Sequence, residues 1–238
     1  MTARRLVAEL LGTAGLLLAI VGSGITASNA GAASTQLFQH AVVVGAALGA
    51  LIVTFGSVSG AHFNPAVTLV DALFGGMSRW LAGGYVVAQL AGAVTGVFAA
   101  NLLCDLPAVA SAGTDRTGIA LAASEGVATF GLLVVIFGVV RSGNTAAVPA
   151  AVGAWIAGAI YFTSSTSFAN PAVTLSRLLT DTYTGIAPAA VPGFLLAQGL
   201  GALAAAATIH WLFRPGRSAA EDVVVPRDQH HERRKAPR

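Results

Sequence analysis

Apolar residues run along this chain in long stretches that few charges interrupt. Residues 10–70, 80–104, 142–176 and 182–213 contain no Asp, Glu, Lys or Arg. Because a membrane-spanning helix needs about 20 mostly apolar residues, these stretches are long enough for several spans. The pattern predicts six transmembrane helices, at residues 5–25, 37–57, 79–103, 119–140, 147–166 and 189–212.

Two short segments between the predicted spans carry the same six letters. The sequence Asn-Pro-Ala-Val-Thr-Leu at residues 64–69 recurs at residues 170–175, an offset of 106. The order of features also repeats between residues 5–103 and 119–213: a helix with a Glu, a second helix, the Asn-Pro-Ala segment, and a helix with a Gln. Each half holds three spans, so the second half enters from the opposite side. Such inverted repeats place their solute site between the halves, near the membrane midplane.

Each Asn-Pro-Ala segment predicts the start of a short helix. Asn is a favoured N-cap, and Pro is favoured at the first helical position. Helices that run from there to about residue 74 and about residue 180 would each span about 15 Å, half of the bilayer core. The residues assigned to these pore motifs are Asn64, Pro65, Ala66, Asn170, Pro171 and Ala172.

The loops that lead into these half-helices, residues 57–63 and 163–169, must lie at membrane depth without helical hydrogen bonds. Such backbone is tolerated only where it is buried in protein or lines a watery cavity. Its carbonyl groups are therefore predicted to accept hydrogen bonds from passing solutes. Asn64 and Asn170 would offer amide donors, and the positive ends of both helix dipoles would oppose cations and protons.

Two carboxylates, Glu9 and Glu125, fall within predicted spans at matching places in the two halves. A carboxylate inside the membrane is costly unless it is paired or hydrogen-bonded. We expect each to accept hydrogen bonds from backbone N–H groups of the adjacent half-helix loop, which is a structural role. The alternative is a proton-coupling site, as in a secondary transporter.

Composition and charge agree with a membrane protein and predict its orientation. Hydrophobic residues make up 55% of the chain and charged residues 10%, against about 25% charged in a soluble domain. With both termini in the cytoplasm, eleven of the 13 Lys and Arg residues lie inside, and only Arg116 and Arg177 outside. This fits the positive-inside rule for a multi-pass protein of the cell membrane. Because this orientation accounts for the excess of Lys and Arg, that excess does not indicate a nucleic-acid partner.

The membrane domain is expected to comprise residues 1–213, followed by a basic tail at residues 214–238 that is predicted to be disordered and cytoplasmic. His230 and His231 in this tail, and the single Cys104, do not form a pattern typical of a metal site. Neither His-Glu-x-x-His nor Gly-x-Ser-x-Gly occurs. We therefore predict no metal, no cofactor and no enzymatic activity.

Residues 59–68, Ser-Gly-Ala-His-Phe-Asn-Pro-Ala-Val-Thr, closely resemble the first signature of the aquaporin, or major intrinsic protein, family. The second Asn-Pro-Ala, the paired glutamates and the six-span layout extend the similarity over about residues 5–213. The resemblance implies an all-α membrane bundle of six transmembrane helices plus two re-entrant half-helices, arranged as an inverted repeat. It also implies passive conduction and, usually, a homotetramer with one pore in each subunit.

The family's narrowest point normally has an Arg directly after the second Asn-Pro-Ala, where this chain has Val173. Counted from the motifs, the resemblance assigns the other filter positions to Val44, Ser167 and Gly158, with Tyr161 as the alternative to Gly158. The filter is therefore expected to be open and apolar.

Charged residues are expected at the two mouths of the pore. Arg177 follows Val173 by four residues, about 6 Å further out, and Asp71 holds the matching place in the first half. We expect Arg177 near the outer mouth and Asp71 near the inner one, where His62 anchors its loop. Two roles for Arg177 stay open: it reaches back to replace the filter Arg, or it pairs with Asp181 on the surface.

Residues 163–169, with Val173 after them, also look like bacterial aquaporins associated with arsenic-resistance operons. Arsenous acid is neutral at physiological pH, rich in hydroxyls and polyol-sized, so an Arg-free filter would admit it together with water and glycerol. The expected partners are thus water, small neutral solutes and the lipid membrane. The alternatives are a strict water channel and an ion-coupled transporter that uses Glu9 and Glu125.

Overall fold

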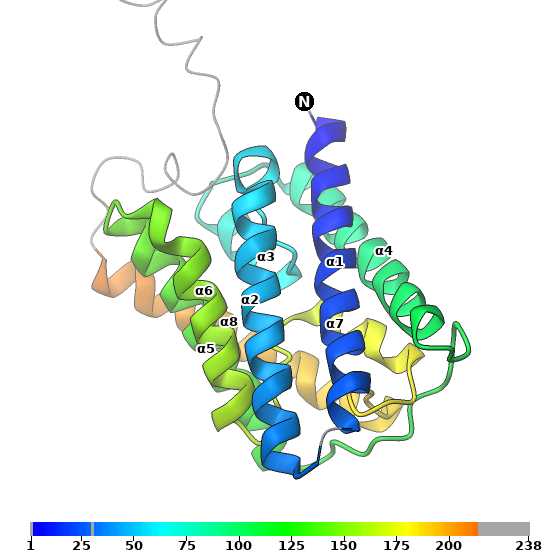
Figure 1. Cartoon of the computed structure of the whole chain (residues 1–238). Helices are drawn as coiled ribbons and strands as arrows, with labels where there is room; N and C mark the ends of the chain where they lie inside the picture. The colour runs from blue at the N-terminus through cyan, green and yellow to red at the C-terminus, as the bar shows by residue number, and fades with distance from the viewer. Residues whose placement is uncertain (1, 30, 214–238) are drawn as a thin grey trace, which may run out of the picture.

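The computed structural model describes residues 2–29 and 31–213, so the tail predicted at residues 214–238 lies outside the described residues. All regular elements in this part of the chain are helices (Figure 1). The long ones are α1 (Thr2–Ser28), α2 (Ala33–Ser59), α4 (Arg79–Leu103), α5 (Ile119–Arg141), α6 (Val148–Phe162) and α8 (Val191–Leu212). The short ones are α3 (Pro65–Leu73), α7 (Pro171–Ser176) and the 3₁₀ turns η1 (Thr145–Ala147), η2 (Arg177–Leu179) and η3 (Pro188–Ala190).

The long helices, two of them extended by a 3₁₀ turn, are long and apolar enough to cross a membrane, which confirms the six predicted spans. The fifth span ends earlier than predicted, at Phe162, because the chain turns there into the loop before the second Asn-Pro-Ala. The second half-helix leaves the α conformation at Arg177 and continues as the turn η2. The carbonyl groups of Leu178 and Leu179 accept hydrogen bonds from Ala112 and Ala110, so they are not available to extend an α-helix.

Helix packing follows the inverted repeat. In the first half α1 packs against α2 and α4, and in the second half α5 packs against α6 and α8. Contacts between α2 and α6 join the halves, and α3 meets α7 within the bundle. Figure 1 shows the long helices side by side, with α3 toward the end that carries the N-terminus and α7 further toward the other end.

Glycines let the last helix of each half approach the first one backbone to backbone. A Cβ atom at Gly92 would lie 2.2 Å from the carbonyl oxygen of Leu10, and one at Gly201 would lie 2.3 Å from that of Gly126. Any larger residue would therefore push α4 away from α1, or α8 away from α5. Small residues serve this purpose in membrane helices generally, because close backbones gain van der Waals contact.

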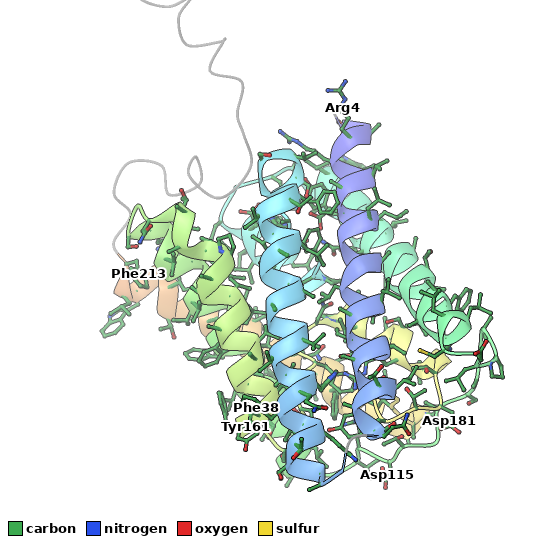
Figure 2. The ribbon with its side chains drawn as sticks, viewed as in Figure 1. Arg4, Phe38, Asp115, Tyr161, Asp181 and Phe213 are labelled. Atoms are coloured by element: carbon green, nitrogen blue, oxygen red, sulfur yellow. The ribbon has the colours of Figure 1, made fainter. Side chains whose placement is uncertain are left out.

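The two ends of the bundle differ in what they carry. Arg4 lies at one end, and Asp115 and Asp181 lie toward the other (Figure 2). We call the first the N-terminal end and the second the opposite end. The loop before α3 starts from the N-terminal end and the loop before α7 from the opposite end, so both loops run to the middle of the bundle.

Candidate functional site

The N-termini of α3 and α7 are joined through their Asn caps. Each Asn Oδ1 accepts a hydrogen bond from the N–H two residues on, at 2.9 Å, which caps its own helix. The Nδ2 groups cross over: Asn64 donates to the Ala169 carbonyl and Asn170 donates to the Phe63 carbonyl, each at 2.8 Å. A carboxamide has two N–H bonds, so each Asn keeps one for the cavity that both of them line.

The loops before the two caps share an unusual backbone. Non-glycine residues in the left-handed region are uncommon and cost about 1–3 kcal/mol each. The offset of 106 relates two of them in the first loop to two in the second, so the strain belongs to the repeat. The pairs are Ala61 (φ 51°) with Ser167 (φ 46°), and Phe63 (φ 49°) with Ala169 (φ 47°). The fifth residue is Thr166 (φ 63°) in the second loop.

Glu9 on α1 holds the first loop. Its side chain is fully buried, and its two oxygens accept hydrogen bonds from the backbone N–H of His62 (3.0 Å) and Phe63 (2.7 Å). Ser59 Oγ (2.6 Å) and Gln89 Nε2 (2.7 Å) donate to the same carboxylate. Four donors on one carboxylate offset the cost of burying it. They also tie α1, α4 and the loop together.

Glu125 on α5 holds the second loop in the same way. It is fully buried and accepts hydrogen bonds from the backbone N–H of Phe168 and Ala169, both at 2.8 Å. Gln198 Nε2 donates to it at 2.7 Å, as Gln89 does to Glu9. Neither glutamate lines the cavity. This arrangement supports the structural role and leaves no oxygen of either carboxylate facing a transported solute.

A cavity runs between the two halves of the repeat and passes both Asn caps. Its volume is about 60 Å³, which is above the roughly 10–15 Å³ that a cavity needs to hold a water. Residues of both loops line it. Much of the remaining lining is aliphatic and includes Leu16, Leu48, Leu132, Ile136, Val152 and Ile156.

Most residues predicted for the pore line this cavity. They are the two Asn caps and Val44, His62, Ser167, Val173 and Arg177. His62 is fixed by a 3.1 Å contact between Nδ1 and Thr68 Oγ1 and by an edge-to-face contact with Tyr85. The Pro and Ala residues of the motifs form the first turns of α3 and α7 behind the Asn caps.

The position assigned to the fifth span needs correction. Gly158 does not line the cavity, and a Cβ atom there would meet the Phe162 ring at 3.7 Å. Tyr161, the alternative, is 52% exposed and packs edge-on against Phe38. Ile156 and Ile160 face the cavity instead. Counting back from the motif misjudged the register, because the loop between α6 and α7 is not helical.

Asp71 is also placed differently from the prediction. It lies at neither mouth: its side chain is fully buried, does not line the cavity, and has no hydrogen-bond partner for either oxygen among the described residues. The turn after α3, at Gly75 (φ 83°), folds the chain back so that Gly76 covers the carboxylate. Tight turns of this kind need the freedom of glycine.

Arg177 is 2% exposed, so it lies inside the protein and not on its surface. Its Nε donates to the Thr184 carbonyl, and its guanidinium carbon lies 3.5 Å from the centroid of the Phe168 ring. The surface pair with Asp181 is not formed, since Asp181 accepts a hydrogen bond from Gly113 N–H instead. This position does not fit the surface pair, and the replacement of the filter Arg by Arg177 stays a prediction.

Sequence reasoning missed Arg116, which binds the loops at the opposite end. Its Nε donates to Gly185 O (2.8 Å), Nη2 to Tyr183 O (3.0 Å) and Nη1 to Ser165 O (3.2 Å). Burial lowers the pKa of this guanidinium, although three carbonyl oxygens solvate it. Arg116 therefore joins the loop before α7 to the loop before α8. Nothing in its sequence neighbourhood signals this contact.

His40, another residue that sequence reasoning missed, lines the cavity and is 2% exposed. It precedes Val44 by four residues on α2, so the two share a helix face. The four-residue spacing between His40 and Val44 could therefore have identified His40 from the sequence.

Six spanning helices around two half-helices, with a narrow cavity between their capped N-termini, define a membrane channel. No group of three or more His, Cys, Asp or Glu side chains gathers in the described part of the chain. The chain belongs to the major intrinsic protein family, whose model matches residues 1–167. Members of this family are channels and not enzymes, and the chain is a multi-pass membrane protein.

Similar proteins carry names from the same family. The chain is 48% identical over 215 residues to "Aquaglyceroporin AqpS" of Rhizobium meliloti (strain 1021), covering 90% of this chain and 92% of that protein. It is 32% identical over 195 residues to "Aquaporin NIP1-3" of Oryza sativa subsp. japonica, covering 77% and 66%. The X-ray structure of the aquaglyceroporin from Plasmodium falciparum matches with a TM-score of 0.72 at 21% identity, covering 90% of this chain and 96% of that one. This last similarity supports the fold.

Proposed function

We propose that this protein is a passive channel for water and for small uncharged solutes of polyol size, such as glycerol and arsenous acid. The observation that carries the proposal is Val173, which lines the cavity directly after the second Asn-Pro-Ala, where the family normally has Arg. A valine there leaves the pore wider and without a fixed charge at this level. The 48% identity to a protein named as an aquaglyceroporin supports the same solute class.

The proposed filter consists of Val44, Ser167, Val173 and Ile160, with Ile160 in place of Gly158. All four residues line the cavity. Three of them are apolar, and Ser167 Oγ is fully enclosed and has no hydrogen-bond partner among the described residues. The solute's hydrogen bonds at this level are therefore proposed to come from loop carbonyls.

Exclusion of cations is proposed to rest on the two half-helices. The N-termini of α3 and α7 meet at the cavity, and each brings the positive end of its dipole. The second N–H of Asn64 and of Asn170 would donate to the oxygen of a passing solute. A cation at this point would face donors and positive dipole ends only.

We propose that both termini are cytoplasmic, that the protein lies in the cell membrane, and that it is a homotetramer with one pore in each subunit. Among the described residues, Arg4, Arg79 and Arg141 mark helix ends on the N-terminal side, which supports the orientation through the positive-inside rule. Large apolar side chains such as Val53 and Leu200 are exposed on the outside of the bundle, where lipid or neighbouring subunits would cover them.

Flux into proteoliposomes tests the proposal. Stopped-flow light scattering would compare water, glycerol and arsenous acid permeability with that of empty liposomes of the same lipid. Entry of glycerol and arsenous acid well above the empty control is the expected result. Fast water flux without either solute would leave a strict water channel. Solute uptake that requires a proton gradient would indicate the ion-coupled transporter.

A further inference from the structure

Two polar residues stand one helical turn from the apolar filter positions, and both are displaced in the same direction. α2 runs from the opposite end of the bundle toward the Asn caps, whereas α7 runs away from the caps toward that end. His40 precedes Val44 by four residues and Arg177 follows Val173 by four. Each therefore lies about 6 Å further toward the opposite end. Both line the cavity.

Arg177 presents hydrogen-bond donors to the cavity. Its Nε is bonded to the Thr184 carbonyl, and its guanidinium plane is supported by the Phe168 ring. Neither Nη group has a hydrogen-bond partner among the described residues, and other atoms do not fully enclose either of them. Since the rest of the residue is buried, these Nη groups open onto the cavity. A guanidinium held at Nε and at its face offers its remaining N–H fork in a fixed direction.

His40 presents an acceptor at the same level. Its Nδ1 lies 2.8 Å from Ser23 Oγ, and Ser23 Oγ also donates to the Ile20 carbonyl. The site proposed below uses the tautomer in which Ser23 gives its single hydrogen to the Ile20 carbonyl and accepts from Nδ1–H of His40, so that the neutral ring keeps Nε2 as a bare acceptor. Nε2 has no partner among the described residues and is not fully enclosed. The ring is steadied edge-on by Tyr183, with centroids 5.9 Å apart.

We propose that Arg177 and His40 form a displaced polar site, one turn from the family's filter, that binds the hydroxyl groups of neutral solutes. A hydroxyl oxygen accepts from the Arg177 fork while its hydrogen is donated to His40 Nε2, so one solute O–H satisfies both side chains. The site rests on the proposed function and specifies its solute class: neutral hydroxylated molecules such as polyols and arsenous acid. Val44 and Val173 would then form the apolar wall of the passage next to this site.

Concentration-dependent exchange of labelled glycerol into proteoliposomes tests the site. The wild-type flux should saturate, and the half-saturating glycerol concentration is the quantity to compare. Arg177→Ala should raise it roughly tenfold, and His40→Ala roughly fivefold, since a charged hydrogen-bond partner contributes more than a neutral one. The matched controls, Arg79→Ala and His210→Ala, remove the same kinds of side chain at exposed positions away from the cavity and should change it less than about twofold. Water permeability of the same vesicles reports that each variant is folded and inserted.

Several outcomes separate the two proposals. If wild type conducts no glycerol above empty liposomes, the proposed function and the site both fail. If wild type conducts glycerol without saturation, or if Arg177→Ala and His40→Ala shift the half-saturating concentration no more than the controls do, the function stands and the displaced site is wrong. Should Arg177→Ala not assemble, Arg177→Lys keeps the charge but loses the planar fork, and it should still raise the half-saturating concentration severalfold. An unchanged value in that variant would overturn the site.

Discussion

Replacing Glu9 by Gln keeps the shape of the side chain and removes its charge and one acceptor oxygen. The carboxylate accepts four hydrogen bonds of 2.6–3.0 Å, two on each oxygen, from Ser59, His62, Phe63 and Gln89. Whichever oxygen becomes the NH₂ group, two donors lose their acceptor: one backbone N–H, which then faces a donor, and one side chain, Ser59 or Gln89, which must reorient. The variant therefore loses about half of the contacts that hold the strained loop before α3.

The structure sets the size of the effect. A hydrogen bond to a charged group contributes about 1.5–3 kcal/mol, so two lost bonds give about 3–6 kcal/mol. We expect the lower end, about 3 kcal/mol, because an unfolded chain in the membrane finds other polar partners. For a protein of this size 1 kcal/mol corresponds to about 2–4 °C. The midpoint of thermal unfolding should therefore fall by about 6–12 °C.

Thermal unfolding in detergent, followed by size-exclusion recovery at one fixed heating time, measures this midpoint. A fixed protocol matters because such unfolding is irreversible and depends on rate. Asp105→Asn is the matched control, since it makes the same chemical change at an exposed position and should shift the midpoint by less than about 2 °C. Glu125→Gln should behave like Glu9→Gln. If Glu9→Gln is as stable as the control, or if it abolishes a flux that a pH gradient drives, the loop-holding role is refuted.

Three further predictions follow from single contacts. Asp71→Asn should raise the thermal midpoint, whereas Glu9→Gln should lower it, because the buried Asp71 carboxylate has no hydrogen-bond partner to lose among the described residues and the cost of its desolvation falls. A lower midpoint would contradict this reasoning. Gly92→Ala should destabilise the protein by about 1–3 kcal/mol through its clash with the Leu10 carbonyl, while Gly199→Ala, with open space around it, should be neutral in the same melts. Val173→Trp should abolish water and glycerol flux in vesicles without lowering the midpoint, and a conducting variant would show that the solute path runs elsewhere.

Sequence reasoning succeeded where the signal is local or repeated. The six spans follow from runs of apolar residues, and α3 and α7 begin where Asn and Pro predict a helix start. The repeated order of features paired Glu9 with Glu125, which are 116 residues apart, and their contacts with the two loops match. It could not show that Asp71 and Arg177, which hold matching places, have unlike surroundings. Gly76 covers Asp71, whereas Arg177 faces the cavity.

The sequence by itself determined the membrane class, the inverted repeat and the two capped half-helices, because hydropathy, helix capping and repetition depend on residues close in the chain. Only the tertiary structure decided which face of α6 borders the cavity, how Arg116 joins two distant loops, and that His40 and Arg177 line the same cavity. Those features depend on helix register and on carbonyl groups supplied by remote segments. A side chain's neighbours across the bundle are set by packing, which no local pattern encodes.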